Sequence, residues 1–123
     1  MSMAQRKKVL VVDDEPNIRD LVRGILEDGY DIAEACDGLQ ALAAVRAAKP
    51  DLIVLDLMMP NMSGLDFCAT LKKERLHDMP IVMLTALGDV ADMEKGYRAG
   101  AISYLAKPFN ATDLQAVVQL MLD

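Results

Sequence analysis

Four apolar segments of the chain each end in polar residues whose side chains suit the chemistry of a phosphoryl group. These residues are Asp13, Asp14, Asp56, Thr85 and Lys107. Carboxylates that share one pocket repel each other unless a cation neutralises them, and Mg²⁺ binds carboxylate and phosphate oxygens together. The set predicts a metal-assisted site in which Asp56 is the nucleophile, Lys107 offsets the phosphoryl charge and Thr85 donates a hydroxyl hydrogen bond.

Asp56 is the first candidate for chemistry because of the segment that precedes it. Leu52–Leu55 is a run of large apolar residues without alternation, which is typical of a strand buried on both faces of a parallel sheet. Such sheets bind ligands at the carboxyl ends of their strands. An aspartate is already ionised at neutral pH, so Asp56 can attack without a general base.

Five segments are predicted to form strands, at residues 8–12, 31–35, 52–55, 81–84 and 101–106. The segment 31–35 is partly polar, which indicates a strand at the sheet edge. Helical patterns separate the segments, as parallel neighbours require. The sequence therefore predicts a doubly wound α/β domain with a parallel sheet in the order 2-1-3-4-5. In that order the strands that end at Asp13 and Asp56 are neighbours, so their carboxylates should lie close together.

Helix starts are predicted from residues that favour a first turn or a cap. These are Pro16, Asp37, Ser63, Asp89 (for a helix to about Ala99) and Asn110. Apolar spacing then predicts which side chains face the core. They are Ile18, Leu21, Val22, Ile25 and Leu26; Leu39, Leu42 and Val45; Leu65, Cys68 and Leu71; and Leu114, Val117, Val118, Met121 and Leu122, with Leu120 at the edge of the last face.

The composition limits the class of protein. The chain has 123 residues, of which 53% are hydrophobic and 26% charged, with a formal net charge of −6. This fits a flexible lead-in at residues 1–7 and one globular domain at 8–123. An acidic surface argues against a general binder of nucleic acid or membranes, and no apolar run is long enough to span a membrane. Cys36 and Cys68 lack disulfide or metal spacing and are interpreted as buried free thiols. A cytoplasmic location is expected.

Each polar residue also has an ordinary structural interpretation. Asp13 and Asp14 precede a proline and could simply cap a helix. Thr85 could be a turn residue, and Lys107 could be a solvated surface lysine. The functional interpretation is favoured because all of them end strands at one edge of the predicted sheet.

Whole motifs around these residues resemble a known family. The motifs are Val-Val-Asp13-Asp14-Glu15, Leu-Asp56-Leu-Met-Met-Pro60, Gly64, Thr85-Ala86 and Tyr104-Leu-Ala-Lys107-Pro108-Phe109. They are similar to those of the receiver domain of bacterial two-component response regulators, of the chemotaxis-regulator type, over residues 7–123. The resemblance implies a (βα)5 flavodoxin-like sandwich. It also implies a signalling switch in which Asp56 accepts a phosphoryl group from a histidine kinase or a histidine phosphotransfer protein.

The resemblance further implies a metal site. Mg²⁺, or Mn²⁺ in its place, would be bound by Asp14, by Asp56 and by the backbone carbonyl of Met58, with Asp13 acting through water.

Phosphoryl contacts and a conformational switch are implied as well. Thr85 and Lys107 would grip the phosphoryl oxygens in the active state. Tyr104 matches the switch aromatic of the family, which turns inward when Thr85 moves. The peptide before Pro108 is expected to be cis, an isomer that is tolerated almost only before proline.

Two positions depart from the common pattern of this family. Met58, two residues after Asp56, and Leu87, two residues after Thr85, are apolar, whereas many relatives carry polar side chains there that orient the attacking water. Neither methionine nor leucine offers such a hydrogen bond. We therefore expect slow self-dephosphorylation and a long-lived acyl phosphate, and no enzymatic activity beyond self-phosphorylation from a donor.

Two alternatives share part of this pattern. A phosphohydrolase of the haloacid-dehalogenase type also uses a strand-end aspartate. It normally needs a second aspartate where this chain has Met58, and a cap domain for which the chain is too short. A receiver used only for docking would not need the intact acids, Thr85 and Lys107. The switch is therefore the preferred interpretation.

The expected partners follow from the resemblance. They are the histidine kinase or phosphotransfer protein and an unidentified downstream target or effector domain, without direct contact to nucleic acid or a membrane. The last helix contains no Lys or Arg, and Ala101-Ile102-Ser103 stands where the transcription-factor branch carries an acidic pair. A monomer or weak dimer is therefore expected rather than the salt-bridged dimer of that branch.

Overall fold

A single parallel sheet forms the centre of the computed structural model, which describes residues 6–57, 59–76, 78–86, 91, 94–95, 98, 100 and 103–122. The strands are β1 (Lys8–Val12), β2 (Asp31–Ala35), β3 (Leu52–Asp56), β4 (Ile81–Ala86) and β5 (Ser103–Lys107). They lie in the order β2-β1-β3-β4-β5. The predicted strand order is confirmed, as is the edge position of β2.

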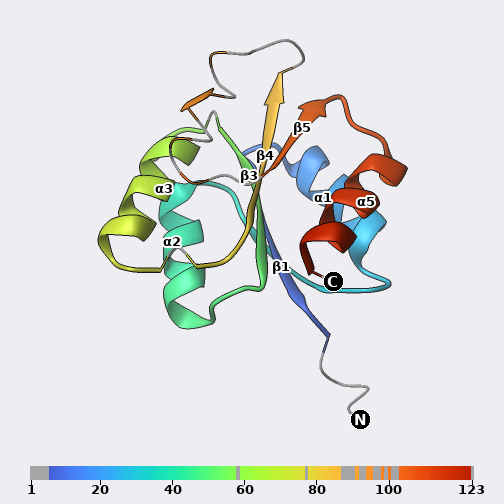
Figure 1. Cartoon of the computed structure of the whole chain (residues 1–123), viewed down its shortest axis with the longest axis horizontal. Helices are drawn as coiled ribbons and strands as arrows, with labels where there is room; N and C mark the ends of the chain where they lie inside the picture. The colour runs from blue at the N-terminus through green and yellow to red at the C-terminus, as the bar shows by residue number, and fades with distance from the viewer. Residues whose placement is uncertain are drawn as a thin grey trace.

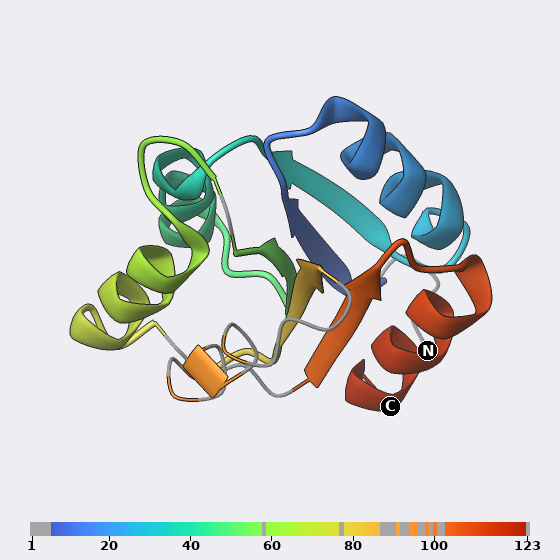
Figure 2. The same cartoon turned by 90° about the horizontal axis from the view of Figure 1, so that it is seen from above.

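Helices cover both faces of the sheet (Figures 1 and 2). They are α1 (Pro16–Leu26) and α5 (Ala111–Leu122) on one face, and α2 (Gly38–Ala47) and α3 (Gly64–Lys73) on the other. The helix predicted at residues 89–99 falls mostly outside the described residues, as do residues 101–102 of the last predicted strand. None of the described helices is long and apolar enough to span a membrane.

β3 is buried along its whole length, as its uninterrupted apolar run predicts. Ile53 and Leu55 belong to the core under α2 and α3. Leu52 and Val54 belong to the core under α1 and α5. Because both faces are covered, the strand needs no polar residue until Asp56, where it leaves the core.

Side-chain caps start three of the helices, as predicted. The carboxylate of Asp37 accepts a hydrogen bond from the amide of Gln40 at 2.8 Å, and the hydroxyl of Ser63 accepts one from Asp66 at 3.1 Å. The third cap, Asn110, accepts one from the amide of Asp113 at 2.8 Å. Each cap satisfies a backbone donor that the first helical turn leaves unpaired.

Two leucines predicted to face the core are instead exposed, Leu21 by 45% and Leu39 by 54%, and Leu120, predicted at the edge of its apolar face, is exposed by 74%. Leu39 and Leu120 lie two positions from buried Ala41 and Val118, and two positions correspond to about 200° around a helix. They therefore point to the opposite side. Each helix contains more apolar residues than its buried stripe can accommodate.

The two cysteines differ in exposure. Cys68 is buried, as predicted, and burial raises the pKa of its thiol to about 11 although Lys72 acts in the opposite direction. Cys36 is only half-buried, so the expectation of a buried thiol was wrong there. It directly follows β2, where the chain leaves the sheet edge.

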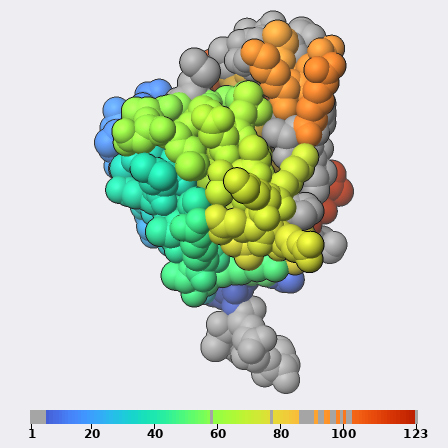
Figure 3. Space-filling view, turned by 90° about the vertical axis from the view of Figure 1, so that its left-hand side faces the viewer, coloured from blue at the N-terminus to red at the C-terminus, as the bar shows by residue number. Residues whose placement is uncertain are grey.

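Figure 3 shows the face of the molecule that α2 and α3 form. The guanidinium of Arg46, near the end of α2, donates a 2.9 Å hydrogen bond from Nε to the carboxylate of Glu74, just after α3. This ion pair joins the exposed ends of the two helices.

Candidate functional site

Four of the predicted site residues, Asp13, Asp56, Thr85 and Lys107, lie at the carboxyl edge of the sheet. Asp13 directly follows β1, and Asp56 and Lys107 are the last residues of β3 and β5. Thr85 lies in β4, and its register partner in β5 is Ala106. Since Val12 of β1 pairs with Leu55 of β3, Asp13 and Asp56 follow neighbouring positions.

Lys107 joins two of the acids. Its Nζ lies 3.0 Å from Oδ2 of Asp13 and 3.6 Å from Oδ1 of Asp56. Burial disfavours its charge, but the hydrogen bond to Asp13 and the attraction of Asp56, Asp13 and Glu15 outweigh this effect and raise the pKa of Lys107. The ammonium group is therefore charged at neutral pH and does not behave as a solvated surface lysine.

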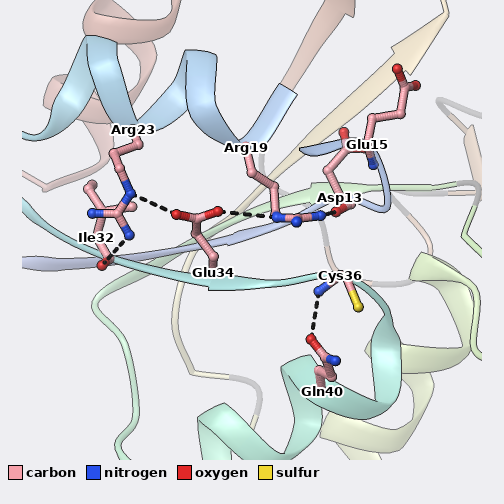
Figure 4. Close-up of polar contacts among 8 residues, drawn as sticks. All are labelled: Asp13, Glu15, Arg19, Arg23, Ile32, Glu34, Cys36 and Gln40. Carbon is pink, nitrogen blue, oxygen red and sulfur yellow. Dashed lines mark hydrogen bonds and ion pairs between the residues drawn. The ribbon is translucent and has the colours of Figure 1, made fainter. Parts of the chain in front are cut away.

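The amide, the carbonyl and the carboxylate of Asp13 all make hydrogen bonds. Its amide donates to the carbonyl of Ala35 at 3.2 Å, and its own carbonyl accepts from Arg19 Nη1 at 2.7 Å (Figure 4). Its carboxylate accepts from the amide of Glu15 at 3.0 Å and from Lys107. The side chain of Asp13 is 0% exposed. A buried carboxylate needs such partners, so the turn after β1 has a defined geometry.

The acids of this turn form a group that could hold a cation. Asp13, Asp14 and Glu15 each offer a carboxylate oxygen, and these oxygens lie within 4.8 Å of one another. Such oxygens are the donors that Mg²⁺ prefers, so the donor chemistry fits the predicted metal. Glu15 was not among the predicted ligands. Met58, whose carbonyl was, lies outside the described residues.

Thr85 has a hydroxyl that is suited to an incoming oxygen atom. The residue is 5% exposed, and its Oγ1 is buried without a hydrogen-bond partner. Such a group carries a desolvation cost that a ligand oxygen would relieve. Tyr104, the predicted switch aromatic, is half-buried on β5 beside Met83 of β4 and packs against the core under α2 and α3.

Two further features support the loops of the site. Asn61, in the loop after β3, has a left-handed backbone conformation with φ of 67°, and its side-chain amide donates to the Asp37 carboxylate at 2.9 Å. The hydrogen bond from the amide of Gln40 is the largest cause that lowers the pKa of the Asp37 carboxyl, and the contact with Asn61 adds to it. After β5, the peptide between Lys107 and Pro108 is cis, which confirms the expectation.

Sequence reasoning missed Arg19, which contacts the backbone of Asp13 from α1. The only available signal was its place beside Ile18 on the apolar side of a predicted helix, where a charged residue needs a partner. The charged partner of Arg19 is Glu34, which lies in β2, so the local sequence could not identify it.

Comparison with known proteins agrees with this geometry. The family model for the response regulator receiver domain matches residues 9–119. The chain is 44% identical over 119 residues to the probable transcriptional regulator ycf27 of Porphyridium aerugineum, which covers 96% of this chain and 49% of that protein. It is 44% identical to the DNA-binding dual master transcriptional regulator RpaA of Synechocystis sp., over 94% of this chain and 48% of that protein.

A solved structure extends the likeness to the fold. The chemotaxis protein CheY4 of Vibrio cholerae superposes with a TM-score of 0.88 at 38% identity, covering 96% of this chain and 100% of that chain. The present chain thus spans about half the length of the curated relatives and the whole length of this structure. The matched model, the identities and the shared fold together establish that the chain belongs to the response regulator receiver domain family.

Proposed function

We propose that Asp56 accepts a phosphoryl group from a phosphohistidine of a kinase or phosphotransfer protein, and that the domain thereby acts as a signalling switch. The observation that carries this proposal is the position of Lys107. Its ammonium group contacts Asp56 and Asp13 at the carboxyl edge of the sheet, next to a turn with further acids. The negative charges at this edge of the sheet are thus partly compensated, which lets the Asp56 carboxylate approach a phosphoryl group.

The chemistry follows from the positions of the side chains. A carboxylate oxygen of Asp56 forms a bond to phosphorus, the phosphorus–nitrogen bond breaks, and the imidazole leaves with the electron pair. Lys107 stabilises the charge on the phosphoryl oxygens, and the Thr85 hydroxyl donates a hydrogen bond to one of them. Asp14, Asp56 and the Met58 carbonyl, with Asp13 acting through water, would hold Mg²⁺, which would supply further charge compensation.

The switch follows from the change in charge. An aspartyl phosphate accepts more hydrogen bonds than a carboxylate and carries more charge, so it favours the conformation in which Thr85 lies closest to it. Tyr104 lies on the strand next to Thr85 and takes the space that Thr85 leaves. The surface over β4 and β5 then reports the phosphorylation to a downstream target.

Receiver domains are signalling switches rather than classical enzymes, and the proposal includes only self-phosphorylation from a donor and slow loss of the group. It places the domain in the cytoplasm as a monomer or weak dimer, with a separate target or effector domain reading its state. Direct contact with nucleic acid is not part of the proposed role of this domain, although the name of the relative RpaA describes that protein as DNA-binding.

Intact mass after incubation with acetyl phosphate and Mg²⁺ tests the proposal. We expect one added phosphoryl group on the parent protein, and none without Mg²⁺ or in Asp56→Asn. Asp20→Asn, at an exposed position of α1, is the matched control and should be modified like the parent. An unmodified parent protein, or an Asp56→Asn variant that still gains the group, would disprove the role of Asp56.

A further inference from the structure

Arg19 of α1 reaches from the helix to the turn that carries the acids of the site (Figure 4). Its Nη1 donates a 2.7 Å hydrogen bond to the backbone carbonyl of Asp13, and its Nε donates a 3.1 Å hydrogen bond to the carboxylate of Glu34 in β2. The Arg19 side chain is only 18% exposed. It therefore has a fixed place between the sheet edge and the acidic turn.

We propose that Arg19 is a positioning residue for the metal site, because it fixes the peptide group that joins Asp13 to Asp14. The carbonyl oxygen of one residue and the amide nitrogen of the next belong to the same rigid plane. A charged donor bonded to that oxygen therefore restricts rotation of the whole peptide plane. The direction in which Asp14 leaves the turn depends on this plane.

The other polar groups of Asp13 cannot replace this contact. Its amide and its carboxylate are held by Ala35, Glu15 and Lys107, which fix the strand end and the side chain. Only Arg19 holds the carbonyl among the contacts that the described residues make to it. Without Arg19, the Asp13 side chain stays in place while the peptide that leads to exposed Asp14 gains freedom.

Arg19 is itself held by an ion-pair cluster. Glu34 accepts from Arg19 with one carboxylate oxygen and from Arg23 with the other, the latter at 2.7 Å. These contacts lower the pKa of Glu34 against the effect of its burial, with the hydrogen bond from Arg23 as the largest cause. Glu34 therefore stays ionised at neutral pH and orients the planar guanidinium group of Arg19. This group donates from two nitrogens to two different acceptors, the Glu34 carboxylate and the Asp13 carbonyl.

Arg23 provides a matched control within the same cluster. It has the same charge, pairs with the same carboxylate and also contacts a backbone carbonyl, that of Ile32 at 3.3 Å. Among the residues that the structure describes, Arg23 makes no hydrogen bond or ion pair with Asp13, and Ile32 lies inside β2 rather than in the acidic turn. Arg19→Gln and Arg23→Gln thus remove one positive charge and one ion pair each, but only Arg19→Gln frees the turn.

The inference rests on the proposed function, so the test separates the two. Titration calorimetry with MgCl₂ in the absence of a phosphodonor measures metal binding directly, and acetyl phosphate labelling of the parent protein is run alongside. We expect Arg19→Gln to weaken Mg²⁺ binding about tenfold and Arg23→Gln to stay within about twofold of the parent, at similar losses of thermal stability. Arg19→Lys keeps the charge but not the planar guanidinium group with its two donors. Its Mg²⁺ affinity should lie between those of the parent and Arg19→Gln.

A structural readout completes the test. In ¹H–¹⁵N spectra of the metal-free proteins, the amide signal of Asp14 should shift in Arg19→Gln and stay in place in Arg23→Gln. If Arg19→Gln does not fold, the Mg²⁺ affinity of Arg19→Lys still tests the positioning role, because an intermediate affinity is expected. Equal Mg²⁺ affinities for the two glutamine variants, or parent-like affinity for Arg19→Lys with an unchanged Asp14 signal, would overturn the positioning role alone. A parent protein that neither binds Mg²⁺ nor is labelled would overturn the proposed function and the inference with it.

Discussion

Gly64 lies so close to Asp56 that no side chain fits between them. A Cβ atom on Gly64 would lie 2.6 Å from the carbonyl oxygen of Asp56 and 3.0 Å from the Cα of Leu57. The amide of Gly64 also donates to the carbonyl of Leu57 at 2.9 Å. Because the close contacts are to backbone atoms, no rotation of a side chain can relieve them. The start of α3 is therefore packed directly on the backbone of the proposed phosphoacceptor.

Gly64→Ala should consequently destabilise the fold and slow phosphorylation. We expect a loss of about 2 kcal/mol in the free energy of unfolding, as for other overpacked positions, because α3 must move away from the end of β3. Urea unfolding and acetyl phosphate labelling measure the two effects. Gly24→Ala in α1 is the control, since a Cβ there has nothing within 4 Å, and it should stabilise the protein by up to about 1 kcal/mol. Equal stability of the two variants would contradict the tight contact.

Lys107→Gln should lower stability and strengthen metal binding at the same time. The variant leaves the buried Asp13 carboxylate without its charged partner, and the free energy of unfolding at neutral pH should fall by about 2 kcal/mol. It also removes a positive charge that repels a divalent cation, so Mg²⁺ affinity should rise about threefold. Urea unfolding and calorimetry measure both quantities.

Lys49→Gln serves as the control for this prediction. Lys49 pairs with Asp78 at 2.6 Å, but the two side chains are 44% and 68% exposed. Exposed pairs contribute at most about 1 kcal/mol, and this one precedes β3 and β4, at the opposite end of these strands from Asp56. An unchanged Mg²⁺ affinity in Lys107→Gln, or the same rise in Lys49→Gln, would show that Lys107 does not compete with the cation.

Glu34 should make stability depend on pH in the acid range. Its pKa is lowered from the ordinary value of 4.5, so the folded state binds a proton less readily than the unfolded chain. The stabilisation is fully present above pH 4.5 and is lost as the pH falls through the lowered pKa of the folded state. Glu34→Gln should lower the midpoint of thermal unfolding by about 4 °C at pH 7. The gap to the parent should shrink below pH 4.5, and a gap that is constant from pH 7 to pH 3 would refute the assignment.

The sequence predicts a long-lived acyl phosphate because Met58 and Leu87 cannot orient water. Both residues lie outside the part of the chain that the structure describes, so this stays a prediction from their side-chain chemistry. Met58→Asn should shorten the half-life of the phosphorylated protein about tenfold, measured as the decay of the phosphorylated mass after removal of the donor. Met58→Leu should leave it unchanged. Equal half-lives of the phosphorylated protein in the two variants would contradict the prediction about Met58.

Much of the fold could be predicted because its signals are local. The uninterrupted run of Leu52–Leu55 identifies a central strand, and Asp37, Ser63 and Asn110 mark helix starts that the structure confirms. The predicted order 2-1-3-4-5 is one of the common orders of doubly wound sheets, and the structure confirms it. The approach of Asp13 to Asp56 then follows from the order, since their strands are neighbours.

What could not be predicted depends on how the elements pack against each other. Leu21 and Leu39 look like core residues in sequence but are exposed, because the orientation of each helix is decided by its whole buried stripe. Phe67, which is 0% exposed in the core, lies outside the spacing of Leu65, Cys68 and Leu71 along α3. Arg19 contacts a backbone carbonyl and a carboxylate outside α1, and neither contact can be predicted from the spacing of residues along that helix.

The outer edge of β2 has a further consequence, for the behaviour of the protein at high concentration. The amide of Asp31 and the carbonyl of Ala35 bond toward β1, so the backbone groups of Ile32 and Cys36 face outward. Side chains of the same molecule occupy two of these outward groups: Arg23 donates to the Ile32 carbonyl and Gln40 accepts from the Cys36 amide. A foreign strand that approaches this edge finds those hydrogen bonds already made. The polar groups around the edge thereby also oppose sheet extension and the aggregation that begins with it.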